Sequence, residues 1–100
     1  MNEEITVVAF LKAKPGAEQQ VADAMKACIA PTLTEESNLS YVPQQDQDDP
    51  QTFVFVERWT SRQGLNDHME TPHFKTLIAS VQGLLEAPPA VHVLKPLTAL

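Results

Sequence analysis

The sequence predicts an α+β domain in which an antiparallel four-stranded sheet carries helices on one face, the ferredoxin-like split βαβ plan. Three observations lead to this prediction. The expected elements follow the order strand, helix, strand, strand, helix pair, strand. The chain has 100 residues without a repeat or a linker, so we expect a single domain over residues 1–100. Both faces of the strongest strand are apolar, so both faces of the sheet need cover.

The first half of the chain predicts a strand, a helix and a second strand. Residues 5–11 are apolar and β-branched without strict alternation, which is typical of a central strand covered on both faces. From Ala17 onward, apolar residues recur at spacings of three and four, and this predicts a helix that Pro31 should kink or end. Residues 39–44 predict a second strand, in which Pro43 indicates an edge position or a bulge.

The second half predicts the strongest strand, two helices and a last strand. Residues 52–59 are rich in aromatic and β-branched side chains and should pair with the preceding strand in a hairpin. Thr60 with Gln63 three positions later predicts a capping box at the start of a short helix. Thr71-Pro72 predicts the N-cap and first turn of another helix, and residues 90–94 predict the final strand.

The parity of the third strand predicts a homodimer. Phe53, Phe55 and Trp59 share one face of this strand, whereas Val54 and Val56 share the other. The helices cover one face, and an open apolar face would make a monomer poorly soluble. The economical cover for the second face is the sheet of a second copy, which gives a dimeric α+β barrel.

Composition excludes several classes of partner. The net charge is −6 and the seven basic residues are scattered, so we expect no binding to nucleic acid or to anionic membranes. The apolar run 5–11 is too short to cross a bilayer, and the N-terminus is acidic where a signal peptide would be basic. We therefore expect a cytoplasmic protein. The single cysteine, Cys28, cannot form an intramolecular disulfide and is typical of a small buried side chain.

The segment from Phe53 to Phe74 concentrates the candidate catalytic residues. Glu57 lies among aromatic side chains, where lost solvation raises a carboxyl pKa and suits the group to general acid or base catalysis. His68 and His73 could each abstract a proton from a phenol or an enol near neutral pH. We predict that Glu57 and His68 form a hydrogen-bonded pair at a pocket wall, either catalytic or structural, with His73 as the reserve candidate for the base.

The same segment supplies most of the predicted substrate-binding residues. Trp59 and Tyr41, with Phe55 and Phe74, could line a pocket for a planar substrate, although such residues more often belong to the core or to an interface. The histidine spacing is not that of a helical metal pair, and we expect no metal. Only three glycines are present, well separated, so flavin and nicotinamide fingerprints are absent and we expect no cofactor.

A family resemblance covers nearly the whole chain. The residues that carry it are Val8 through Gly16 with Glu18, Pro31-Thr32 followed by Glu35, Leu39 through Tyr41, Asp49-Pro50, Phe53 through Trp59, Ser61, Leu65, His68 and Thr71 through Phe74. With these residues the chain resembles the antibiotic biosynthesis monooxygenase family, dimeric α+β barrels that include quinol monooxygenase-like members. Ser37-Asn38 depart from the Gly-Cys that members commonly carry. The first strand lacks the Asn of the haem-degrading relatives, and this disfavours haem turnover.

The resemblance implies a cofactor-independent monooxygenase for a small aromatic or quinol-like substrate. A deprotonated, electron-rich quinol or anthrone can itself give an electron to oxygen, so the protein need supply only a base, a dry pocket and groups that stabilise the anion. Two alternatives stay open. One is isomerisation or breakdown of a small carbonyl metabolite by the same acid and base groups, and the other is a non-catalytic dimer that binds a small molecule.

Overall fold

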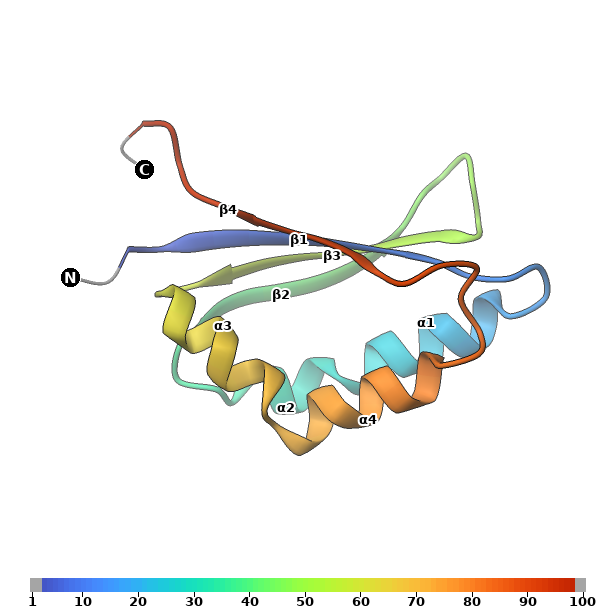
Figure 1. The fold of residues 1–100 in the computed structure, drawn as a ribbon, viewed down its shortest axis with the longest axis horizontal. Helices are drawn as coiled ribbons and strands as arrows, with labels where there is room; N and C mark the ends of the chain where they lie inside the picture. Colours follow the sequence, from blue (N-terminus) through green and yellow to red (C-terminus); the bar gives the residue numbers. More distant parts are fainter. Residues whose placement is uncertain (1–2, 99–100) are drawn as a thin grey trace.

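The structure, a computed structural model, describes residues 3–98. The elements in chain order are β1 (Ile5–Lys12), α1 (Glu18–Ala27), α2 (Ile29–Leu33), β2 (Asn38–Gln45), β3 (Thr52–Trp59), α3 (Arg62–Met69), α4 (Pro72–Val81) and β4 (Ala90–Leu94). The strands form one antiparallel sheet in the order β2-β3-β1-β4, and all the helices lie on one side of it (Figure 1). The predicted α+β split βαβ architecture is confirmed.

The positions of the strands in the sheet follow from their side chains. β1 lies between β3 and β4, as its run of apolar residues predicted. β2 lies at an edge, where Pro43 can be accommodated because an outward-facing N–H is not needed for the ladder. The register of β2 against β3 shifts between Asn38 and Ser40, so the irregularity lies at the start of the strand and not at the proline.

The first helical segment divides close to the predicted proline. α1 ends at Ala27, and α2 begins at Ile29 with Pro31 in its first turn, where the N–H that proline lacks would have no partner within α2 in any case. Thr32 is fully buried and anchors α2 against the core. The short α2 leads directly into the turn that carries Glu35, a residue of the site described below.

The start of α3 lies one residue later than predicted. The capping box at Thr60 is wrong: Ser61 is the N-cap, and its Oγ accepts a hydrogen bond of 3.2 Å from the Gly64 N–H. The Thr60 N–H is already used, since it donates to the Ser37 carbonyl at 2.9 Å. A Cβ at position 64 would lie 2.5 Å from the Ser37 Cβ, so glycine allows α3 to approach this turn closely. The predicted Thr71 cap is confirmed, because its Oγ1 accepts from the Phe74 N–H at 3.2 Å.

The two faces of the sheet differ in their cover. The side chains that face the helices are buried and form the core; on β1 and β3 they are Ile5, Val7, Ala9, Leu11, Phe53, Phe55, Glu57 and Trp59. On the opposite face Phe10, Val42 and Leu94 are exposed large apolar side chains.

Within residues 3–98, none of the helices combines the length and the apolar character that a membrane span requires.

Candidate functional site

A cavity of about 330 Å³ lies between the helix-facing side of the sheet and helices α3 and α4. Its lining is mostly apolar and comes from all four strands and both helices. The lining residues include five of the seven predicted site residues, namely Tyr41, Phe55, Glu57, His68 and Phe74. The exposed lining residues Met69, Ile78 and Val91 mark where the cavity opens between the helix pair and β4. This composition, apolar walls with a few polar groups, is typical of small-molecule sites.

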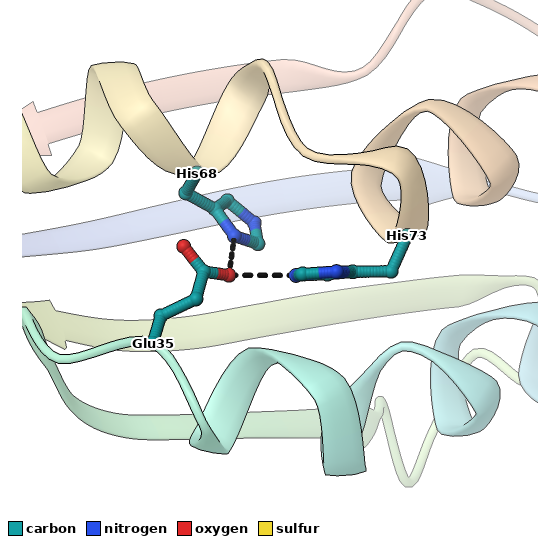
Figure 2. A group of neighbouring side chains, drawn as sticks. All are labelled: Glu35, His68 and His73. Carbon is teal, nitrogen blue, oxygen red and sulfur yellow. Dashed lines mark hydrogen bonds and ion pairs between the residues drawn. The ribbon is translucent and has the colours of Figure 1, made fainter.

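His68 is the most deeply buried polar group of this cavity. It lies in the last turn of α3, and only 1% of its surface is exposed. Its Nδ1 forms a hydrogen bond of 2.6 Å with Glu35 Oε2 (Figure 2). Its other ring nitrogen, Nε2, is buried and has no hydrogen-bond partner among the described residues. A buried polar atom without a partner is costly, so a ligand that hydrogen-bonds to Nε2 would remove this cost.

Glu35 joins two histidines through a single oxygen. Besides His68, its Oε2 contacts His73 Nε2 at 2.7 Å, so the carboxylate reaches from the turn after α2 to both α3 and α4 (Figure 2). The His73 side chain is 20% exposed and does not line the cavity. The structure therefore brings His68 and His73 together but places only His68 at the cavity. Their common partner, Glu35, was not among the predicted site residues.

The contact with Glu35 decides which nitrogen of His68 is available. An ionised carboxylate can only accept hydrogen bonds, so Nδ1 carries the proton and Nε2 carries the lone pair. Burial lowers the pKa of His68, although the hydrogen bond and charge of Glu35 act in the opposite direction. His68 is thus held neutral near pH 7, with the nitrogen remote from Glu35 able to accept a proton.

The predicted hydrogen bond between Glu57 and His68 is wrong. Glu57 Oε1 instead accepts a hydrogen bond of 2.9 Å from Trp59 Nε1, because residues two apart on a strand point to the same face. Glu35 takes the place at His68 that was predicted for Glu57. Both Glu57 and His68 nevertheless line the same cavity on the helix-facing side of the sheet.

Glu57 is a buried carboxyl group with an altered pKa. Only 5% of the residue is exposed. Burial raises its pKa from the ordinary 4.5 to about 7; the hydrogen bond from Trp59 opposes this shift and the negative charge of Glu35 adds to it. The group is therefore largely protonated below neutral pH, as the sequence predicted for a carboxylate among aromatic side chains.

The aromatic residues form a layered wall around His68. Tyr41 stacks on Phe55 with ring centroids 4.6 Å apart, while Trp59 and Phe74 lie 4.7 Å and 5.1 Å from the His68 ring. The Tyr41 hydroxyl donates to Cys28 Sγ at 3.5 Å, and burial raises the pKa of Tyr41. Trp59 is fully buried and supports Glu57 and His68 without lining the cavity, so its predicted role in substrate contact is replaced by a packing role.

Within residues 3–98, one group of side chains could hold a metal ion, and it consists of Glu35, His68 and His73. Their potential ligand atoms lie within 4.8 Å of one another. Yet the two oxygen–nitrogen distances, 2.6 and 2.7 Å, are those of hydrogen bonds. Two ligands of a tetrahedral zinc ion with bonds of about 2.0 Å lie about 3.3 Å apart. The two histidines are arranged to hydrogen-bond with Glu35, and the expected absence of a metal stays a prediction.

Comparisons with known proteins now identify the family. The family model described as "Antibiotic biosynthesis monooxygenase" matches residues 4–80. The chain belongs to this family. The Mycobacterium tuberculosis protein named "Putative monooxygenase Rv0793" is 34% identical over 97 residues, with 97% of this chain and 95% of that protein covered. The structure of Rv0793 superposes with a TM-score of 0.90 at 33% identity, over 97% of this chain and 98% of that one.

Other relatives extend the comparison. The Escherichia coli protein named "Probable quinol monooxygenase YgiN" is 30% identical over 89 residues, with 79% of this chain and 86% of that protein covered. The crystal structure of PA3566 from Pseudomonas aeruginosa gives a TM-score of 0.90 at 28% identity, with 98% of both chains covered. A Synechocystis protein, sll1783, is 27% identical over 94 residues, and the match spans 94% of this chain but 64% of that protein. The predicted family membership is confirmed.

Proposed function

We propose that this member of the family is a cofactor-independent monooxygenase that oxidises a small aromatic or quinol-like substrate with molecular oxygen. One observation carries the proposal. A neutral, buried histidine lines an apolar cavity, and its Nε2 has no hydrogen-bond partner within residues 3–98. The monooxygenase names of the family and of its relatives support the reaction class.

His68 Nε2 is the proposed base. It takes a proton from the acidic position of the substrate, and the resulting imidazolium is stabilised by Glu35 through the 2.6 Å contact at Nδ1. His73 holds the same Glu35 oxygen at 2.7 Å and is a positioning residue. The apolar walls exclude water from the substrate anion and keep it available for oxygen.

The reaction balances without an external reductant. For an anthrone, two C–H bonds break at one carbon, one oxygen atom enters as a carbonyl, and the other leaves as water with the two protons. The substrate supplies all four electrons that reduce O₂. The protein's part is to remove the first proton and to stabilise the anion that remains.

The site belongs, in this proposal, to a homodimer. Phe10, Val42 and Leu94 on the face of the sheet opposite the helices are the surface that a second copy would cover. His92 lies on the same face, directly opposite Val8 of β1. Sedimentation at micromolar concentration tests this point, and a monomer alone would contradict it. The cytoplasmic location and the lack of nucleic-acid partners stay predictions from the sequence.

The decisive experiment measures oxygen uptake. The purified protein is incubated with a panel of quinols and anthrones, with and without oxygen, and with His68→Gln in parallel. We expect uptake of one O₂ per substrate oxidised in the wild type and strong loss in the variant. Absence of uptake with every substrate would contradict the proposal. Deuterium exchange at a substrate carbon without oxygen uptake would instead indicate the isomerase alternative.

A further inference from the structure

The carboxyl of Glu57 is a buried acidic group of the cavity that has no role in the proposed mechanism. Its Oε1 accepts the hydrogen bond from Trp59, and Oε2 has no hydrogen bond to any residue between 3 and 98. The side chain lines the cavity with His68, and both groups pack on the same indole. Oε2 is therefore the oxygen of Glu57 that a ligand in the cavity can reach.

The groups around Glu57 leave its charge uncompensated. On the flanking strands it lies opposite Tyr41 of β2 and the apolar Val7 of β1. His68 of α3 and the exposed Arg62 line the same cavity, and neither forms a hydrogen bond or an ion pair with Glu57. The charge of Glu35 acts on it from the turn after α2 and is of the same sign. Among residues 3–98, the Trp59 indole N–H is the one group found to lower the pKa of Glu57 and so favour its ionised form.

We propose that Glu57 binds the ligand as a neutral carboxylic acid and donates a hydrogen bond from Oε2 to an oxygen of the ligand. This inference rests on the proposed function only in taking the cavity as the substrate site. His68 Nε2 then accepts from a hydroxyl or an acidic carbon, and Glu57 donates to a second, acceptor oxygen. The geometry thus selects a flat aromatic molecule that carries an acidic hydrogen and, separately, a carbonyl or another acceptor oxygen.

This arrangement also serves the proposed chemistry. When His68 removes a proton, the negative charge of a conjugated substrate moves onto its acceptor oxygen, where a fixed donor in a dry site stabilises it. A protonated carboxyl in an apolar pocket can supply that donor. An ionised Glu57 would repel the anion and offer no hydrogen, so ligand binding should weaken when this group loses its proton. The pKa of about 7 places that loss near neutral pH.

A matched pair of small phenols tests the inference. Meta-hydroxyacetophenone has a hydroxyl and a carbonyl, and meta-ethylphenol has the same carbon skeleton without the carbonyl oxygen. Both stay mostly neutral from about pH 6.5 to about pH 8.5. Their dissociation constants are measured by protein-observed NMR across this range for the wild type and for Glu57→Gln, which keeps an N–H donor but cannot ionise. Asp67→Asn, an acid-to-amide change at an exposed site of α3, is the control.

We expect the ketone to bind the wild type at least about tenfold more weakly at the upper pH limit than at the lower limit. Its affinity should not change with pH in Glu57→Gln, whereas Asp67→Asn should keep the wild-type dependence. Meta-ethylphenol should show no comparable change in any of the three proteins. A pH-independent affinity of the ketone in the wild type, an equal fall in Glu57→Gln, or no binding of the ketone at this cavity would overturn the inference.

The outcome separates this inference from the proposed function. Oxygen uptake with a quinol or an anthrone, together with a pH-independent affinity for the ketone, would refute only the role of Glu57. A fall in affinity that depends on Glu57, without oxygen uptake for any substrate, would refute the oxygenase and support Glu57 as a ligand-binding group.

Discussion

Glu35 and Glu57 are two carboxyl groups in the region of His68, and they differ in their hydrogen-bond partners. Glu35 contacts two imidazoles through one oxygen, so partners that can carry positive charge surround it. Glu57 has one neutral donor, the Trp59 indole, and its pKa rises to about 7. The contrast shows that partners and burial, and not residue type alone, decide how a carboxyl group behaves. In the roles proposed above, Glu35 holds a base in place and Glu57 supplies a hydrogen-bond donor.

The largest expected effect comes from removing the proposed base, His68. His68→Gln should lower turnover at least about a hundredfold, because the variant has no ring nitrogen to accept the substrate proton. Oxygen uptake measures the rate, and sedimentation checks that the assembly persists. Asn66→Ala, an exposed change on the same helix, should keep full activity. A loss of stability with unchanged turnover per folded molecule would make His68 a structural residue.

The second prediction concerns how the stability of the wild type and of Glu57→Gln depends on pH. The folded-state pKa of Glu57 lies above its ordinary value, so its contribution to stability is fully present below about pH 4.5 and is lost as the pH rises through about 7. Over that window the free energy of unfolding should fall by roughly 3 kcal/mol from this group.

The Glu57→Gln protein should lack this contribution to the fall in the free energy of unfolding, which urea unfolding at a series of pH values measures. Glu35→Gln should retain most of the fall, since burial is the main cause of the raised pKa of Glu57. An identical pH dependence of stability in the wild type and Glu57→Gln would mean that Glu57 is already ionised in the folded protein.

Glu35→Gln should reduce turnover by about tenfold to a hundredfold, less than loss of His68 itself. The amide no longer enforces a proton on His68 Nδ1 and no longer stabilises the imidazolium. Because Glu35 raises the pKa of His68, the acidic limb of the kcat/KM profile should also move to lower pH. A merely structural Glu35 would leave that limb in place, and this result would contradict the assigned role.

The smallest effect is expected for His73. His73→Asn removes a contact to Glu35 but no group that lines the cavity, so turnover should fall less than about tenfold. Steady-state oxygen uptake is again sufficient. If the loss instead matched that of His68→Gln, His73 would become the candidate base.

The fold could be predicted because local patterns determine it. The apolar runs of β1 and β3, the proline at an edge strand and the cap at Thr71 each act within a few residues. The N-cap predicted at Thr60 was wrong by one residue, since Thr60 and Ser61 both carry a hydroxyl that can cap a helix. The Thr60 N–H donates to the Ser37 carbonyl, and Ser61 is the N-cap.

The site could be predicted only in part, because its contacts join distant segments. Strand parity placed Glu57 with the aromatic residues, and the segment 53–74 supplied both histidines. Glu35 lies 33 residues before His68 in the sequence, and no periodicity links them. Its only signal was its place among the residues that carry the family resemblance. Strand parity alone places Trp59 beside Glu57 on one face, but the predicted partner of Glu57 was His68 and not the indole.

The central claim is that Glu35 fixes His68 with a proton on Nδ1 and a free lone pair on Nε2. Heteronuclear NMR of the imidazole nitrogens at neutral pH tests it directly. We predict a protonated Nδ1 and an unprotonated Nε2 for His68 in the wild type, with this preference lost in Glu35→Gln. A proton on Nε2 of the wild-type ring would contradict the account, because the nitrogen assigned as the base could not then accept a proton from a substrate.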